Sequence, residues 1–231
     1  MNDLKSQNRK KSRRIGYLNT IEHRYYIFCE GEQTEPNYFR GFEKTIKENP
    51  IYKNALYIET IGVGAETLRV INHAEEYVIK NSIDNAKIWC VYDKDSFPSQ
   101  NFNAVSEKAK HLNVSQTKAT YCVAWSNQCI EYWFILHFDW YDSDNDRKYY
   151  RKYLHGKFAE LGWKRYEKNN EDLFYILTDF GNPKLAIKHA NNRLAQCSGL
   201  TDADSSPATK VHLLVEELAK YLPEQLQKKY I

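Results

Sequence analysis

Residues 24–125 alternate between short apolar segments and helical segments, and this alternation restricts the fold more than any other feature. Four segments rich in aromatic and β-branched residues, at 24–29, 55–61, 87–92 and 119–125, lack the polar alternation of half-exposed strands. Amphipathic helices are predicted between them, from residue 36 and at 66–80 and 102–112, with a fourth at 128–138. Strands buried on both faces and separated by helices are typical of a parallel sheet. We therefore predict an α/β fold with a mainly parallel, four-stranded sheet flanked by helices.

Residues 140–231 have a different pattern. They predict helices at about 147–160, 171–178, 183–197 and 207–221, joined by polar loops, and no strand. We therefore expect three regions: a basic, flexible tail at residues 1–20, an α/β domain at 21–139, and a helical extension at 140–231 that packs on it.

The basic character of the chain is concentrated at its N-terminus. Residues 1–14 contain six basic residues and one acidic residue, a net charge of +5, although the whole chain carries only +3. A flexible cationic arm would attract nucleic-acid phosphates without sequence preference, through Arg9, Lys10, Lys11, Arg13 and Arg14. A disordered terminus that only aids solubility explains the same composition, and both interpretations stay open.

Several protein classes are disfavoured by what the sequence lacks. No run approaches the roughly 18 apolar residues that span a bilayer, and the polar N-terminus does not read as a secretory leader. We therefore expect a cytoplasmic protein without a membrane partner. The five cysteines form no CxxC pair, which disfavours a zinc ribbon. The turn Gly62-Val63-Gly64 lacks the third glycine of a dinucleotide-binding fingerprint.

Acidic residues follow the predicted strands at the points where they end. Glu30 follows the first strand, Asp93 and Asp95 the third, and Glu131 lies just after the fourth. Ligands bind at the carboxyl ends of parallel strands, so these side chains would meet if the third strand lies beside the first. Clustered carboxylates need a counter-charge, and Mg²⁺ or Mn²⁺ suits them. Each motif alone also fits a solvated loop or, as for Glu35 and Glu131, a favourable acid in a helix's first turn.

The motifs also resemble a known family. The sequence is similar to the RloB/AbiLii family of bacterial phage-defence proteins and, more broadly, to the Toprim domain of topoisomerases, primases and some nucleases. The matching motifs are residues 29–38 (CEGEQTEPNY), 93–95 (DKD), 126–133 (SNQCIEYW) with the run to residue 138, and 206–212 (SPATKVH). The resemblance covers about residues 24–215. It departs from the family at Gln128 and Ser206, where proline and asparagine are frequent, and this affects only loop geometry.

The resemblance implies a Toprim-like, Rossmann-like fold and a metal-dependent nuclease. Glu30, Asp93 and Asp95 would be catalytic and would bind Mg²⁺ or Mn²⁺, with Glu35 and Glu131 as secondary ligands. Hydrolysis of DNA or RNA, with tRNA as one candidate, would serve abortive infection or restriction-associated defence beside an ATPase partner encoded nearby.

Other residues are candidates for contacts with the substrate. The resemblance places Asn127 and Thr34 near the site and His212 either beside it or in a structural role. Lys94 could approach a phosphate, although strand alternation points it away from the ligand edge. His137 lies in an apolar helical segment, which favours a core histidine over a catalytic base. The cations Arg147, Lys148 and Arg151 lie among tyrosines, a mix that suits nucleic-acid contact or a helix with inward tyrosines and outward cations.

Three hypotheses remain open. A nuclease would cleave with Mg²⁺ or Mn²⁺ and lose activity in Asp93→Ala. A non-catalytic nucleic-acid-binding or regulatory subunit of an ATPase complex would bind without metal and weaken when residues 1–14 are removed. A nucleotidyl- or phosphotransferase would consume a nucleoside triphosphate without cutting polymers. The sequence leaves open the choice of DNA or RNA, sequence specificity, the need for the ATPase, the trigger and any oligomer.

Overall fold

The centre of the molecule is a five-stranded sheet. The computed structural model describes residues 22–115 and 118–231, and the strand order is β2-β1-β3-β4-β5. The strands are β1 His23–Cys29, β2 Leu56–Gly62, β3 Ala86–Asp93, β4 Ala119–Asn127 and β5 Ala208–Thr209. The first four are parallel, and β3 lies beside β1. The predicted α/β fold with a mainly parallel sheet is confirmed, and the arrangement is compatible with a Toprim-like fold.

The fifth strand corrects the prediction that residues 140–231 contain no strand. β5 pairs antiparallel with the end of β4, Thr209 opposite Ser126 and Ala208 opposite Asn127. The helix predicted from residue 207 begins only at Val211. The preceding segment is extended because the Lys210 amide and the Thr209 hydroxyl both donate to the Trp125 carbonyl, at 2.8 and 3.0 Å.

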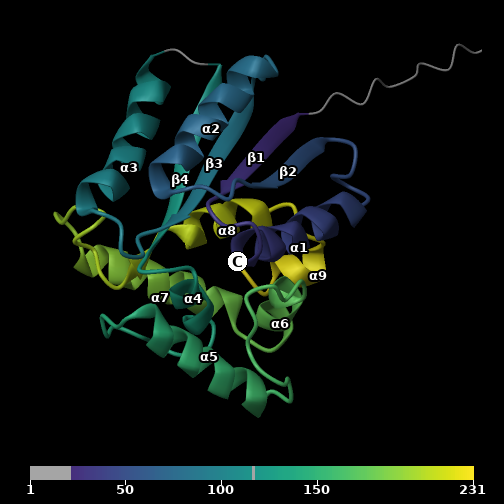
Figure 1. The fold of residues 1–231 in the computed structure, drawn as a ribbon. Helices are drawn as coiled ribbons and strands as arrows, with labels where there is room; N and C mark the ends of the chain where they lie inside the picture. Colours follow the sequence, from purple (N-terminus) through teal and green to yellow (C-terminus); the bar gives the residue numbers. More distant parts are fainter. Residues whose placement is uncertain (1–21, 116–117) are drawn as a thin grey trace, which may run out of the picture.

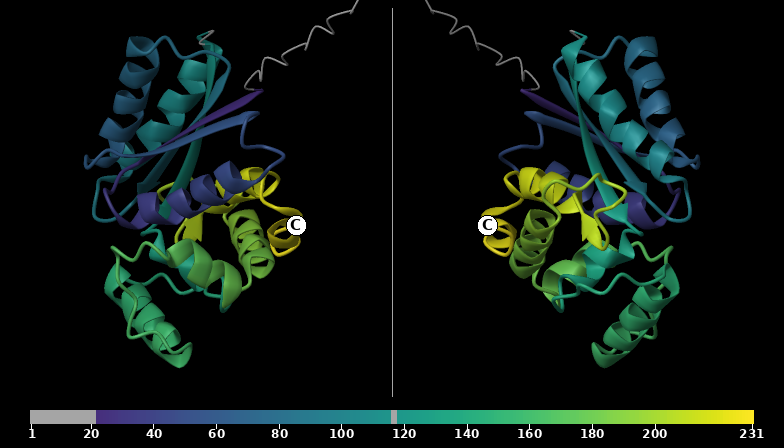
Figure 2. Two further views of the ribbon diagram at one scale, coloured as in Figure 1. Left: turned by 90° about the vertical axis from the view of Figure 1, so that its right-hand side faces the viewer. Right: turned by 90° about the vertical axis from the view of Figure 1, so that its left-hand side faces the viewer.

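Helices cover both faces of the sheet (Figures 1 and 2). The helices α2 (Thr67–Lys80) and α3 (Ser99–Val114) pack on one face, and α1 (Thr34–Glu48) and α8 (Val211–Ala219) pack on the other. The apolar residues that predicted α1 from their helical spacing are all buried: Tyr38, Phe39, Phe42 and Ile46. Sequence spacing and the observed core therefore agree for this helix.

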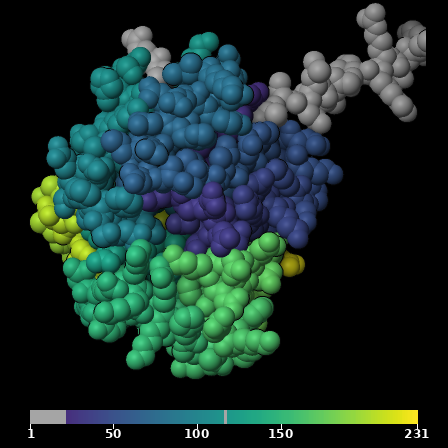
Figure 3. All heavy atoms as spheres, in the orientation of Figure 1, coloured from purple at the N-terminus to yellow at the C-terminus, as the bar shows by residue number. Residues whose placement is uncertain are grey.

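Most of the remaining helices form a layer below the sheet in the view of Figure 1. The remaining helices are α4 Glu131–Ile135, α5 Arg147–Glu160, α6 Leu173–Asp179, α7 Pro183–Gln196 and α9 Glu224–Gln227. The helix predicted at 128–138 is thus shorter than expected. One continuous core cluster joins Ile27 of β1 to Tyr132 of α4, Leu154 of α5 and Leu177 of α6. In the space-filling view the early part of the chain, in purple, reaches the surface at the seam above this green layer (Figure 3).

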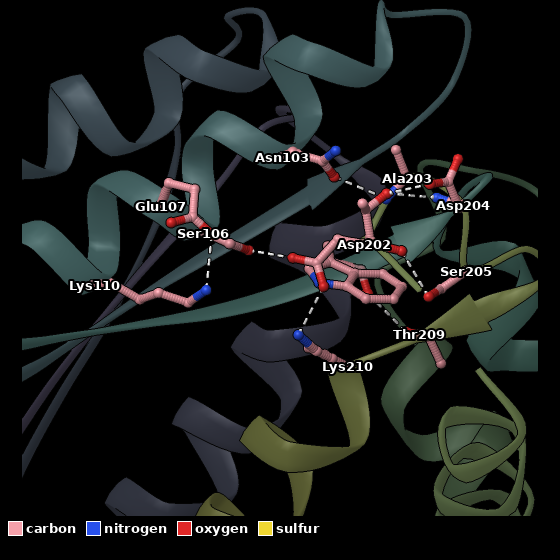
Figure 4. Close-up of polar contacts among 12 residues, drawn as sticks. Asn103, Ser106, Glu107, Lys110, Asp202, Ala203, Asp204, Ser205, Thr209 and Lys210 are labelled. Atoms are coloured by element: carbon pink, nitrogen blue, oxygen red, sulfur yellow. Dashed lines mark hydrogen bonds and ion pairs between the residues drawn. The ribbon is translucent and has the colours of Figure 1, made fainter. Parts of the chain in front are cut away.

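Residues 202–210, called the C-terminal segment below, link α3 to the end of β4 (Figure 4). The Ala203 amide donates to Asn103 Oδ1 at 2.9 Å, and the Ala203 carbonyl accepts from Asn127 Nδ2 at 2.9 Å. Asp202 pairs with Lys210 at 2.9 Å and accepts from the Ser106 hydroxyl. The turn after β4 is therefore held by residues from the far end of the chain.

Two expectations concern the rest of the chain. In the part that the structure describes, no helix has both the length and the apolar character needed to cross a membrane. The candidate nucleic-acid contacts of the tail, Arg9, Lys10, Lys11, Arg13 and Arg14, lie outside the described residues.

Candidate functional site

A pocket of about 510 Å³ opens at the carboxyl ends of β1 and β3. It collects the three predicted catalytic residues, Glu30, Asp93 and Asp95, together with Glu35 and Thr34. The full lining is Glu30, Gly31, Glu32, Gln33, Thr34, Glu35, Gly64, Asp93, Asp95 and Lys168. The pocket therefore lies where the topology of a parallel sheet places ligands.

Glu30 is fixed directly against β3. Its Oε2 accepts a hydrogen bond from the Asp93 amide at 2.9 Å, and its Oε1 accepts from the Thr67 hydroxyl at 3.4 Å. The neighbouring positions of β1 and β3 in the sheet make this contact possible, since the Glu30 amide also donates to the Val91 carbonyl at 2.9 Å. Thr67 begins α2, and no sequence motif pointed to it.

Glu35 reaches the pocket because residue 31 is a glycine. The side chain of Glu35 lies in the first turn of α1 and is buried. A Cβ built on Gly31 would overlap Glu35 Oε2. The Glu-Gly pair that follows β1 thus has two functions: the first residue supplies a carboxylate, and the second leaves room for another.

The end of β4 shapes the loop that carries Asp95. The Lys94 amide donates to the Ser126 carbonyl and the Asp95 amide to the Gln128 carbonyl, both at 2.9 Å. Asp95 has a φ of +40°, a left-handed conformation that aspartate tolerates better than most residues. The Lys94 ammonium bonds the Phe97 carbonyl and does not line the pocket, in agreement with strand alternation.

The carboxylates form a desolvated cluster of like charge. Burial, together with the nearby charges of other carboxylates, raises the pKa of Glu30 and of Glu35 to about 7. Burial, then the charges of Glu35, Glu131, Glu30 and Asp95, raise the pKa of Asp93 well above its ordinary value. One oxygen of each aspartate, Asp93 Oδ1 and Asp95 Oδ1, is buried without a hydrogen-bond partner. Among the described residues, no hydrogen-bond donor therefore reaches these two oxygens of the cluster.

Cations from the helical layer bind its outer side. Arg147 Nη1 lies 2.9 Å from Asp95 Oδ2, and Arg151 Nε lies 3.1 Å from Glu131 Oε1. Both arginines are candidates for nucleic-acid contact in the sequence, and in the structure they pair with candidate metal ligands. Lys168, which sequence reasoning missed because it lies in a polar loop without a motif, lines the pocket 3.9 Å from Glu131 Oε1.

The remaining candidates do not line the pocket. Glu131 is almost completely buried, and its charge raises the pKa of Glu35 and Asp93. Asn127 donates to the C-terminal segment, as described above. His212 is fully buried in α8. Lys148 lies over the Tyr149 ring, 5.1 Å from its centroid.

The donor set fits a hard divalent cation in its chemistry. Carboxylate oxygens are the ligands that Mg²⁺ and Mn²⁺ prefer, and the two unpartnered aspartate oxygens are the type of group such an ion would satisfy. Among residues 22–115 and 118–231, however, no three side chains of His, Cys, Asp or Glu are already arranged to hold an ion. Binding would require these carboxylates to move closer together.

Comparison with known proteins agrees with the motifs. The family model described as RloB-like protein matches residues 25–218, which include all the carboxylates of the site. No curated protein and no solved structure matches the chain. Because this family model spans most of the sequence, the chain belongs to the RloB-like protein family.

Proposed function

We propose that the protein is a metal-dependent nuclease of the Toprim type that hydrolyses phosphodiester bonds with Mg²⁺ or Mn²⁺. The observation that carries the proposal is the pocket in which Glu30, Glu35, Asp93 and Asp95 meet at the carboxyl ends of adjacent parallel strands. The raised pKa values of Glu30, Glu35 and Asp93 support it, since clusters of desolvated carboxylates with perturbed pKa values are typical of functional sites.

The chain's own residues have distinct roles in this proposal. Asp93 and Asp95 would hold the ion with their unpartnered oxygens, and Glu35 would add a further ligand. Glu30, whose pKa burial raises to about 7, would accept and return a proton near neutral pH. When bound, the ion would supply Lewis acidity and neutralise charge on the phosphoryl group.

The biological setting of the proposal comes from the family resemblance. RloB/AbiLii-like proteins occur in phage-defence loci, so we infer an effector that degrades DNA or RNA, with tRNA as one candidate, under the control of an ATPase partner. The cationic composition of residues 1–14 supports a nucleic-acid substrate.

Asp93→Asn provides the first test. The variant replaces a carboxylate oxygen with an amide nitrogen and keeps the side-chain shape. We expect it to reduce Mn²⁺-dependent cleavage at least about a hundredfold, the upper end of what loss of an outer-shell partner of a metal ligand costs. Cleavage of DNA and tRNA would be measured with and without the ATPase, and with EDTA. Asp84→Asn is a matched control because Asp84 precedes β3 at the end away from the pocket.

The same experiment separates the proposal from its alternative. Binding of nucleic acid that persists in EDTA and in Asp93→Asn, without any cleavage by the wild type in Mn²⁺, would contradict the nuclease and favour a non-catalytic subunit. Equal cleavage by wild type and Asp93→Asn would show that the activity arises elsewhere.

A further inference from the structure

The ion pair between Arg147 and Asp95 joins the helical layer to the pocket. Arg147 is the first residue of α5, and its Nη1 lies 2.9 Å from Asp95 Oδ2. The other carboxylate oxygen, Asp95 Oδ1, is buried without a partner. One oxygen of Asp95 is therefore neutralised by an arginine, while the other has no hydrogen-bond partner among the described residues.

We propose that Arg147 is an exchangeable counter-ion: it leaves Asp95 when a divalent cation binds in the pocket, and the freed guanidinium then binds a phosphate of the nucleic acid. This inference rests on the proposed function, because it assumes that the carboxylate cluster takes a metal ion. It assigns to Arg147 a substrate-binding role that depends on the metal.

The absence of a ready-made metal site in the described residues gives the first argument. The carboxylates line one pocket, yet no three of them are arranged to hold an ion. Mutual repulsion keeps like charges apart, and Arg147 attracts Asp95 toward α5. Binding of a cation among the carboxylates removes the repulsion and competes directly with the guanidinium for Asp95.

The exposure of the two arginine pairs gives the second argument. Arg147 and Asp95 have side chains that are 45% and 27% exposed, and such partly exposed pairs contribute little to stability. Arg151, in contrast, pairs with Glu131, whose side chain is 1% exposed, so its removal would leave a buried charge without a partner. Arg147 can therefore be released at little cost, whereas Arg151 stays as a structural partner.

The chemistry of the guanidinium gives the third argument. Arginine binds carboxylate and phosphate oxygens with the same planar set of donors, so the group that now binds Asp95 is suited to a phosphodiester. Lys168, half exposed and lining the same pocket, would remain as a second positive charge beside the substrate. The pocket would thus change from acid–arginine pairing to a site with bound metal and a free arginine.

Metal affinity without any nucleic acid is the first measurement. Free Mn²⁺ would be titrated by EPR against the full chain and its variants. We expect Arg147→Ala to bind Mn²⁺ about fivefold more tightly, because a competing partner of modest strength is gone. Lys148→Ala is the matched control: it removes the same charge from the next position of α5 and should change the affinity less than about twofold. Arg147→Lys keeps the charge and should resemble the wild type.

The salt dependence of nucleic-acid binding is the second measurement. Binding of a single-stranded oligonucleotide would be followed in Ca²⁺ and in EDTA, with its integrity checked on a gel. In Ca²⁺ we expect Arg147→Ala to reduce the slope of log affinity against log salt by about 0.7, the value for one phosphate contact. In EDTA, where Arg147 stays on Asp95, the slopes of variant and wild type should agree.

The outcomes separate this inference from the proposed function. If the wild type binds no Mn²⁺, the metal-dependent nuclease is wrong and the exchange has no basis. If the wild type binds Mn²⁺ but Arg147→Ala and Lys148→Ala change the affinity equally, the exchange alone is wrong. Tighter Mn²⁺ binding with no change of slope in Ca²⁺ would overturn the assignment of Arg147 to a phosphate.

Discussion

Gly31 determines where the carboxylate of Glu35 can lie. Any Cβ at position 31 would occupy the place of Glu35 Oε2. The obstacle is the end of a flexible side chain, so Glu35 can rotate away without disturbing α1. Residue 31 therefore controls the composition of the pocket more than the stability of the fold.

Replacing Gly31 with alanine should weaken metal binding while the protein stays folded. We expect Gly31→Ala to lower Mn²⁺ affinity by about tenfold, the lower end of what loss of a supporting group costs at metal sites. Titration by EPR and the unfolding midpoint in EDTA would be measured together. Gly156→Ala is the matched control, since a Cβ there meets nothing within 4 Å and alanine favours the helix. Unchanged Mn²⁺ affinity in Gly31→Ala would exclude Glu35 as a ligand.

At the level of elements, the outer edge of β4 is closed in two ways. Near its end, the Trp125 carbonyl accepts from the Lys210 amide, and β5 pairs with the last two residues. Farther back, the carboxamide of Asn113 bonds both backbone groups of Tyr121: Oδ1 accepts from the amide at 2.7 Å, and Nδ2 donates to the carbonyl at 2.8 Å. A side chain of α3 thus acts as a short substitute for a neighbouring strand.

Removing this carboxamide should destabilise the sheet edge. Asn113→Ala leaves two backbone groups of Tyr121 without their partner, so we expect a loss of about 1–3 kcal/mol in the free energy of unfolding. Urea denaturation would measure it. Lys110→Ala, which breaks only an exposed ion pair with Glu107 on the same helix, should change the stability by less than about 0.5 kcal/mol. A cost for Asn113→Ala no larger than that of Lys110→Ala would show that water satisfies Tyr121 equally well.

The strands that could be predicted differ physically from the one that could not. β1 and β3 are nearly continuous apolar runs because helices bury both of their faces, and that burial is visible in composition. β2, at the edge of the sheet, instead alternates buried and half-buried residues, so its predicted burial on both faces is wrong. β5 has two residues, and only its contact with Ser126 and Asn127 makes it a strand. A contact between residues so far apart in the chain cannot be predicted from the local sequence around Ala208 and Thr209.

The same distinction applies to the site. Glu30, Asp93 and Asp95 could be placed together because the rule for parallel strands fixes where their ends lie. The pairing of Arg147 with Asp95 depends on how α5 packs below the sheet, and no spacing in the sequence encodes that packing. From the sequence alone, Arg147 is therefore a candidate for nucleic-acid contact or an outward-pointing cation, and its partner Asp95 cannot be foreseen.

At the scale of the whole molecule, two buried histidines link stability to pH. Burial lowers the pKa of His137 and of His212 to about 4. His137 Nδ1 donates to the Trp133 carbonyl at 3.0 Å, while its Nε2 is buried without a partner. Below about pH 6.5 the two histidines bind protons in the unfolded chain but stay neutral in the folded chain. They therefore reduce the free energy of unfolding as the pH falls toward 4.

Replacing His137 with phenylalanine should remove part of that dependence. The quantity measured is the unfolding free energy of His137→Phe minus that of the wild type. We expect this difference to be about 2 kcal/mol more favourable to the variant at pH 5.0 than at pH 7.5, since a shift of one pKa unit is worth 1.36 kcal/mol. Because both proteins contain the acidic cluster, whose raised pKa values act in the opposite direction, its contribution cancels. Urea denaturation at both pH values measures the difference.

The exposed His155 provides the control for this comparison. His155→Phe should show the same difference from wild type at pH 5.0 and at pH 7.5. A pH-independent difference for His137→Phe as well would show that His137 is protonated in the folded protein at pH 5.0.

The pairing of β5 with β4 has a consequence for how the protein is made. Ser126 and Thr209, whose hydroxyls lie 3.0 Å apart, are separated by 83 positions, so the ribosome adds one long after the other. While that stretch is being translated, the residues at the end of β4 that bond the Asp95 loop are already present. β5, which pairs with the end of β4, has not yet been made. A ribosome-bound chain of this kind would therefore acquire its fully supported acidic edge only after Ala208 and Thr209 have been added, well after the carboxylates of the pocket themselves.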